Sequence, residues 1–96
     1  MNDNDFLRLL EAAVVVAKPV SADAIDIDDM DMSLVDAGID SLDMLMIGIC
    51  MTDVFGVGEE EAKTMQVGTP REMREFLLKH ATVDVIDVDK AIAELK

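Results

Sequence analysis

The stretch "DAGIDSLDMLMIGICMTDVF", from Asp36 to Phe55, decides the fold that the sequence predicts. Between Met44 and Met51 it holds no charged residue, so a helix over these two turns carries apolar groups on every side. Gly56 follows Phe55, as is typical of a helix end. We therefore predict a helix over residues 41–55 with more apolar surface than one core contact needs.

Three further helices are expected around it. Residues 5–17 carry apolar side chains at helical spacing, and the pair Lys18-Pro19 would end that helix. Residues 59–65 fit a short helix. Thr69 and Glu72, on either side of a proline, form a capping-box pattern that predicts a third main helix ending near His80.

The connection over residues 20–40 alternates aspartate with apolar residues. This alternation could indicate a strand, but the many aspartates and the lack of a partner strand favour an ordered loop. We expect its apolar residues to hold it on the core, with a helical turn over residues 33–36.

Two segments follow from these predictions: a helical bundle over residues 1–82 and a C-terminal extension over residues 83–96. In the extension Asp87 is a candidate N-cap, followed by an apolar stripe at helical spacing. It either packs across the bundle or docks a partner. The predicted fold is all-α: a small antiparallel four-helix bundle with three main helices and one short one, plus an extra C-terminal helix.

Charge and composition limit the function classes. The 96-residue chain has a formal net charge of −13, and residues 19–62 hold twelve acidic residues and no Lys or Arg. Such a surface repels nucleic acid and anionic membranes and attracts basic partners.

The presence of only one cysteine, Cys50, excludes an internal disulfide. The N-terminus lacks the basic region of a signal peptide, and no apolar stretch reaches membrane-span length. We expect a cytoplasmic monomer.

Ser41 stands alone between Asp40 and the apolar run, and three roles are open for it: nucleophile, helix N-cap or attachment point. Catalysis needs a base, yet the single histidine, His80, belongs to another predicted helix, and no G-x-S-x-G elbow is present. We therefore do not expect an enzyme. A calcium loop starting at Asp29 would place Leu34 where a glycine is needed, so no metal site is expected beyond weak divalent binding.

Around Ser41 the sequence resembles a known protein family. Residues 34–57 look like the core of an acyl carrier protein or thiolation domain, a phosphopantetheine-binding carrier. The resemblance rests on Gly38-Ile39-Asp40-Ser41-Leu42, on the apolar helix that follows and on its closing aromatic residue, Phe55. The likeness extends over residues 3–81, and the chain departs from common members enough to be a specialised one.

The resemblance implies that a phosphopantetheinyl transferase attaches 4′-phosphopantetheine to Ser41, with Asp40 and Leu42 completing the cofactor site. The terminal thiol would hold acyl groups as thioesters for enzymes of fatty-acid, polyketide or specialised lipid biosynthesis. Asp40 would help the transferase hold its magnesium and the hydroxyl. The alternative is a small acidic interaction or calcium-binding bundle with no prosthetic group.

The central helix has two apolar stripes. By resemblance, the stripe with Met44 and Gly48 faces inward, and the other stripe recognises partner enzymes through basic or apolar docking patches. Alternatively both stripes are buried. Common members have a glutamate at the place of Met46, so we expect a more apolar docking patch here. The residues assigned to partner recognition are Asp43, Leu45, Met46, Ile49 and Asp53.

Family members hold the acyl chain in a cleft between helices. Gly48 in mid-helix would let another helix or a bound chain come close. Alternatively, the candidate lining residues are ordinary core residues that line no pocket. The predicted pocket lining is Ile47, Met51, Phe55, Met65, Met73 and Leu77.

Overall fold

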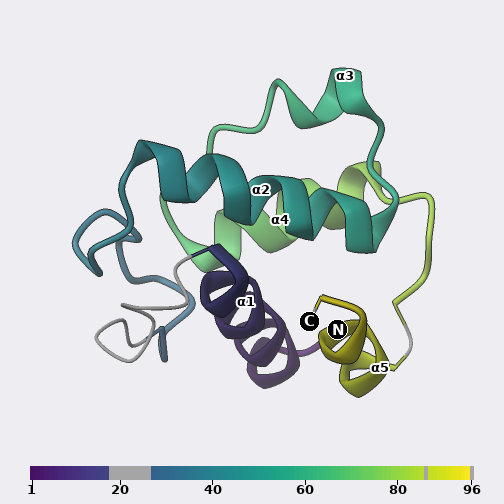
Figure 1. The fold of residues 1–96 in the computed structure, drawn as a ribbon, viewed down its shortest axis with the longest axis horizontal. Coiled ribbons are helices and arrows are strands. Elements are labelled where there is room, and N and C mark those ends of the chain that lie inside the picture. Colours follow the sequence, from purple (N-terminus) through teal and green to yellow (C-terminus); the bar gives the residue numbers. More distant parts are fainter. Residues whose placement is uncertain (18–26, 86, 96) are drawn as a thin grey trace.

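The computed structural model describes residues 1–17, 27–85 and 87–95, and these residues form helices and no strand. The all-helical prediction, including the C-terminal helix, is confirmed. Figure 1 shows the five helices: α1 (Asp3–Ala17), α2 (Ser41–Phe55), α3 (Glu59–Ala62), α4 (Pro70–His80) and α5 (Val88–Leu95). None of the described helices is long and apolar enough to cross a membrane.

The helix boundaries follow local capping chemistry. Thr69 Oγ1 accepts from Glu72 N at 3.2 Å and Pro70 occupies the first helical position, as predicted for α4. The Glu72 carboxylate accepts from Gly68 N at 3.2 Å, one residue before the N-cap. In α5, Asp87 Oδ1 accepts from Lys90 N at 3.1 Å, which confirms Asp87 as a capping residue. The predicted short helix over residues 59–65 is only one turn long.

The core lies between α1, α2 and α4. Phe6, Leu9 and Leu10 of α1 are fully buried against the inner stripe of α2 and the apolar face of α4. Burying an aliphatic or aromatic side chain of this size contributes about 1.5–3 kcal/mol. This set of buried side chains therefore holds the three main helices together.

Two of the main helices run in the same direction rather than antiparallel. In Figure 1, α2 and the paler green α4 behind it both begin at the left and end at the right. The hydrogen bonds agree: Thr82 N, just after α4, donates to Phe55 O at the end of α2 at 3.1 Å. The long connection through α3 allows this, because it carries the chain back before α4 begins.

The described part of the long connection, residues 27–40, is an ordered loop held on the core. Ile27, Met30 and Leu34 are buried, as predicted. Leu34 N donates to Gly68 O and Arg71 N donates to Met30 O, both at 2.9 Å. The helical turn is present, since Ala37 N donates to Ser33 O at 3.1 Å. The predicted stop at Lys18-Pro19 and the rest of the loop lie outside the described residues.

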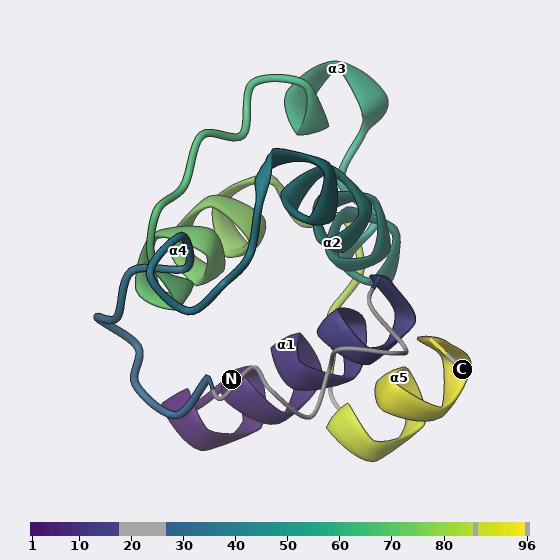
Figure 2. The same ribbon diagram turned by 60° about the vertical axis from the view of Figure 1, so that its left-hand side comes forward.

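The C-terminal extension packs across the bundle. Val88 and Ala91 of α5 are buried, and Arg8 of α1 is paired with Asp89 of α5. Figure 2 shows α5 lying alongside α1, with α3 on the far side of α2. The extension therefore shares the core of residues 1–82.

The ion pair between Asp31 and Arg71 ties the loop to α4, with Arg71 Nε 2.7 Å from Asp31 Oδ1. The hydrogen bond from the guanidinium lowers the pKa of the Asp31 carboxyl. Because this pKa is lower in the folded chain, the pair stabilises the fold above the ordinary aspartate pKa of about 3.9. That contribution is lost as pH falls through the folded-state value.

We expect Asp31→Asn to lower the free energy of unfolding slightly at neutral pH, as is usual for exposed pairs. Urea unfolding of both proteins at several pH values measures this. The difference between them should shrink on acidification and vanish once the pH is below the folded-state pKa of Asp31. Asp28→Asn, at a nearby exposed aspartate of the same loop, is the matched control. An Asp31→Asn deficit that persists undiminished in acid would contradict the assignment.

Candidate functional site

A reciprocal capping box fixes the start of α2. Asp40 Oδ1 accepts from Asp43 N at 2.9 Å, and Asp43 Oδ2 accepts from Asp40 N at 3.4 Å. These bonds satisfy backbone donors that a helix start leaves unpaired. Asp40 is therefore the N-cap, and Ser41 is the first residue of the helix.

Ser41 is exposed at this helix start. The interpretation of Ser41 as an N-cap is wrong, because Asp40 takes that role. The hydroxyl is thus not required for the local fold. The carboxylates of Asp40 and Asp43 already complement the positive end of the helix dipole, so a phosphate attached to Ser41 would gain little from that dipole. The site fits a covalent tether that projects into solvent.

The outer stripe of α2 is exposed and apolar. The exposed fractions are 68% for Leu42, 60% for Leu45, 41% for Met46 and 54% for Ile49, whereas the inner-stripe residues Ile47 and Met51 are 0% exposed. The alternative that both stripes are buried is therefore wrong. Single exposed apolar residues are ordinary, but a run of four along one helix face is typical of an interaction surface.

Two acids of α2 differ in placement. Asp53 is exposed near the end of the helix, where it can meet a partner. Asp43 is buried and its carboxylate belongs to the capping box. Asp43 therefore holds the helix start in place, a role that the assignment to partner recognition did not include. Between them, half-buried Cys50 has its thiol pKa raised by burial and by the nearby Asp53 charge.

A groove of about 940 Å³ runs along α2 beneath α3 and the chain that follows it. Ser41 and Asp40 line one end of the groove, so the candidate attachment residue is in contact with it. Its walls are mainly apolar. The lining residues are Val35, Ile39, Asp40, Ser41, Met44, Leu45, Gly48, Ile49, Thr52, Glu59, Ala62, Lys63, Met65, Gln66 and Val67.

Most of the residues predicted to line an acyl pocket are core residues in the structure. Of the six residues named, only Met65 lines the groove. The other five are closed into the core, with at most 1% of their surface exposed, as the plain-core alternative states. Those five are Ile47, Met51, Phe55, Met73 and Leu77. Sequence spacing identified apolar residues on inward faces, but the groove lies along the flank of α2 that carries Met44, Gly48 and Thr52, where the chain after α3 passes.

The candidate residues for other chemistry lie apart. His80, at the end of α4, packs against Phe76 with ring centroids 4.6 Å apart and the rings tilted by 46°, and it is not among the groove-lining residues. Of the aspartates in the calcium-like pattern, Asp31 is paired with Arg71 and Asp40 caps α2. Among the residues that the structure describes, no cluster of three or more potential ligands is arranged to hold a metal ion.

The capping geometry predicts different losses of stability for substitutions at two neighbouring residues, Asp40 and Ser41. Asp40→Ala should lower the free energy of unfolding by about 1 kcal/mol, since it removes an N-cap hydrogen bond. Ser41→Ala, the matched control one residue away, should change it by less than about 0.5 kcal/mol, as is usual for surface substitutions. Chemical denaturation of both variants measures the two effects. Equal losses would contradict the assignment of Asp40 as the cap.

Comparison with known proteins gives no further identification. No protein-family model matches the chain, and no significant similarity is found to a curated protein or to a solved structure. Any assignment of function therefore rests on the sequence motif and on the geometry of the α2 helix start, its outer face and the groove.

Proposed function

We propose that the chain is a carrier protein of the acyl-carrier type, modified with 4′-phosphopantetheine on Ser41, and that it is not itself an enzyme. One observation carries the proposal. The Ser41 hydroxyl is exposed at the first residue of α2, at one end of an apolar groove and beside an exposed apolar helix face. A tether, a space for cargo and a docking surface therefore meet at one residue.

The residues around Ser41 suit attachment by a separate enzyme. A transferase supplies its own base, so the lack of a neighbouring histidine is no obstacle to modification. The Asp40 carboxylate caps α2 through one oxygen, Oδ1. Carboxylate oxygens suit magnesium, which commonly binds one or two carboxylates together with substrate phosphates. In this proposal Asp40 orients the helix start and also helps the transferase hold its metal.

The arrangement of helices supports the same proposal. We infer that α1, α2 and α4 are the three main helices of a carrier bundle, that α3 is its short helix, and that α5 is an addition. Once attached, the arm supplies a terminal thiol on which acyl groups form thioesters. The arm is anchored at Ser41, and the apolar groove along α2 can shield the acyl group that the arm carries from water.

The outer face of α2 is the proposed docking surface for acyl-transferring and acyl-modifying enzymes. Its apolar residues adjoin Asp53, and α3 adds the exposed acids Glu59, Glu60 and Glu61. A partner with an apolar centre and a basic rim would match this pattern. Opposite charges across such an interface speed association, and methionine adapts to an irregular partner surface.

The attachment is tested by incubating the unmodified chain with coenzyme A and a broad-specificity phosphopantetheinyl transferase. Intact-mass spectrometry should show a gain of one phosphopantetheinyl group per chain. Ser41→Ala should gain nothing, while Ser33→Ala, at another serine, should be modified like the parent chain. An unmodified parent chain under conditions that modify a known carrier would overturn the proposal.

The docking surface is tested by Met46→Glu in the loaded protein. A charge at the centre of the apolar face should slow acyl transfer to its own partner enzyme about tenfold or more, since burying an unpaired carboxylate costs several kcal/mol. Leu78→Glu, at an exposed apolar residue on α4, is the control and should leave transfer unchanged. Equal transfer rates for the parent chain and Met46→Glu would exclude this face as the docking surface.

A further inference from the structure

A second pocket, separate from the groove along α2, lies between the end of α2 and the C-terminal extension. It has a volume of about 310 Å³, and we name it the α5 pocket. Of its described lining residues, Val54 belongs to α2 and all the others belong to the extension over residues 83–96. The bundle over residues 1–82 would therefore not form this pocket by itself.

The inner part of the α5 pocket is apolar. Val54 and Val85 are half-buried and pack on the hydrophobic core, and Ala91 of α5 is buried. Val83, which is exposed, adds a further apolar side chain from the segment before α5. A ligand that reaches the inner wall gains most by placing methylene or methyl groups against these side chains.

The walls of the α5 pocket are fixed to one another before any ligand binds. Phe55 O, at the end of α2, accepts from Thr82 N at 3.1 Å and from Val83 N at 3.2 Å. Gly56 adopts a φ of 67°, and a Cβ there would lie 2.7 Å from Val83 Cγ2, so the extension lies directly on the end of α2. At the other wall, Val88 is buried where α5 packs on the bundle. A preformed pocket does not lose binding free energy to the ordering of its own walls.

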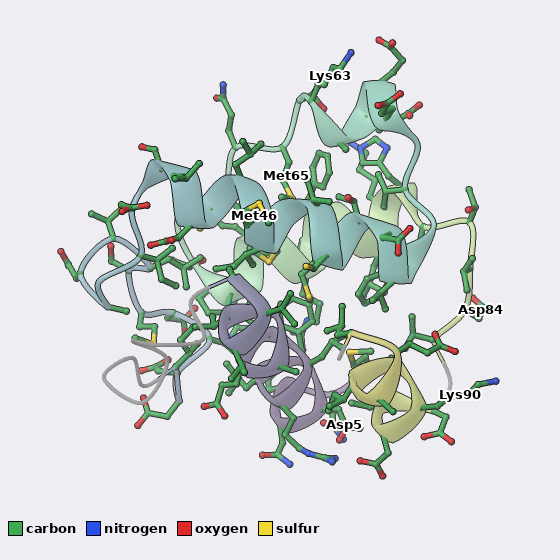
Figure 3. All side chains as sticks on the ribbon, in the orientation of Figure 1. Asp5, Met46, Lys63, Met65, Asp84 and Lys90 are labelled. Atoms are coloured by element: carbon green, nitrogen blue, oxygen red, sulfur yellow. The ribbon has the colours of Figure 1, made fainter. Side chains whose placement is uncertain are left out.

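Acidic side chains surround the opening of the α5 pocket. Asp84, Asp87 and Glu94 line it and are exposed, and the lining also includes one cation, Lys90. Figure 3 shows Asp84 and Lys90 at the same edge of the molecule, with the Lys90 side chain extending outward from α5. Three carboxylates against one ammonium leave the opening with a net negative charge.

We propose that the α5 pocket takes one arginine side chain from a partner protein. An arginine can bury its methylene stem on apolar surface while its charged head stays at the opening, and the α5 pocket offers both environments. Arginine suits a partly enclosed site better than lysine, because the guanidinium is more weakly hydrated and its planar fork can meet two carboxylates. The volume is at the lower limit for small-molecule pockets, which fits one side chain rather than a helix.

The position of the α5 pocket favours an arginine from a partner that docks on α2. Asp53, the exposed residue before Val54, adjoins the outer face of α2 that the proposed function assigns to docking. A protein that covers this face therefore reaches the pocket at the end of the same helix. That the partner is an acyl-processing enzyme rests on the proposed function, whereas the binding of arginine in the pocket does not. The C-terminal extension then both packs across the bundle and contacts a partner.

The test uses the full chain, labelled with ¹⁵N and without any arm, so that it does not depend on modification of Ser41. The probe is N-acetyl-arginine methylamide, which mimics one arginine within a protein chain. In NMR spectra the probe should shift the amide resonances of Val85 and Ala91 and leave those of Asp28 and Asp36, in the acidic loop, in place. The citrulline analogue has a similar shape and no charge, and it should shift none of these resonances.

Charge variants distinguish the α5 pocket from the general negative charge of the chain. The double variant Asp84→Asn/Glu94→Gln should weaken arginine binding about threefold or more, since each exposed charge pair contributes modestly. Lys90→Gln should strengthen it about twofold, because the competing cation is removed. Asp28→Asn/Asp36→Asn removes the same charge from two exposed positions of the acidic loop. This variant is the matched control and should bind like the parent chain.

The inference is overturned if the arginine probe leaves Val85 and Ala91 unshifted, or if the citrulline analogue shifts them equally. Equal losses of affinity in the two double variants would also overturn it, since binding would then follow net charge alone. The spectra of the parent chain decide the first two outcomes even where a variant fails to fold. If arginine binds but a transferase leaves Ser41 unmodified, the pocket assignment stands and the carrier function fails. If Ser41 is modified but no arginine binds, the carrier function stands and the pocket assignment fails.

Discussion

The capping box between Asp40 and Asp43 fixes the starting point of α2, and the rest of the site depends on that starting point. Each residue of a helix is turned by about 100° from the one before, so the first residue determines which side every later residue faces. With α2 beginning at Ser41, the positions of Ile47, Met51 and Phe55 turn into the core. The positions of Leu42 and Ile49 turn outward by the same rule. The hydroxyl of Ser41 is left at the open end of the helix.

The outer apolar face of α2 is exposed to water, and none of the described helices packs over it. The α3 segment, residues 59–67, crosses above part of α2 and leaves a groove, while α1 and α4 pack against the inner side of α2. The extension that forms α5 covers α1 instead. The high net negative charge opposes self-association of the exposed stripe, since copies of the chain repel one another. In the proposed function, this repulsion would keep the surface available for a partner of opposite charge.

The sequence predicts the helices well because their ends carry strong local signals. Thr69 and Pro70 at the start of α4, Gly56 after α2 and Asp87 before α5 each act through their own backbone geometry or nearest hydrogen bonds. The same holds for the two stripes of α2, which follow from helical spacing alone. These features require no knowledge of how the helices are arranged.

The groove could not be predicted in this way. Spacing shows that Met51 and Met73 are apolar and lie on inward faces, but it cannot distinguish a core position from the wall of a groove. That distinction depends on where the α3 segment passes, and its single helical turn has too weak a pattern to place it. The sequence also led to Ser41 as a candidate N-cap, because serine suits that role as well as aspartate does. The acid at position 43, able to return a hydrogen bond to Asp40 N, is the signal that favours Asp40.

The chemistry of the site also fits the requirement that a carrier must release its cargo. Asp40 and Asp43 offer a phosphodiester no attraction, so in the proposed function the arm stays free to reach into the active site of another enzyme. The groove would hold a chain through apolar contact alone, which is non-directional and grows with the length buried. Cargo could then leave without breaking a specific hydrogen bond or ion pair. Because the α3 segment is held by few contacts, a partner that docks on the adjacent outer face of α2 could open the groove at little cost.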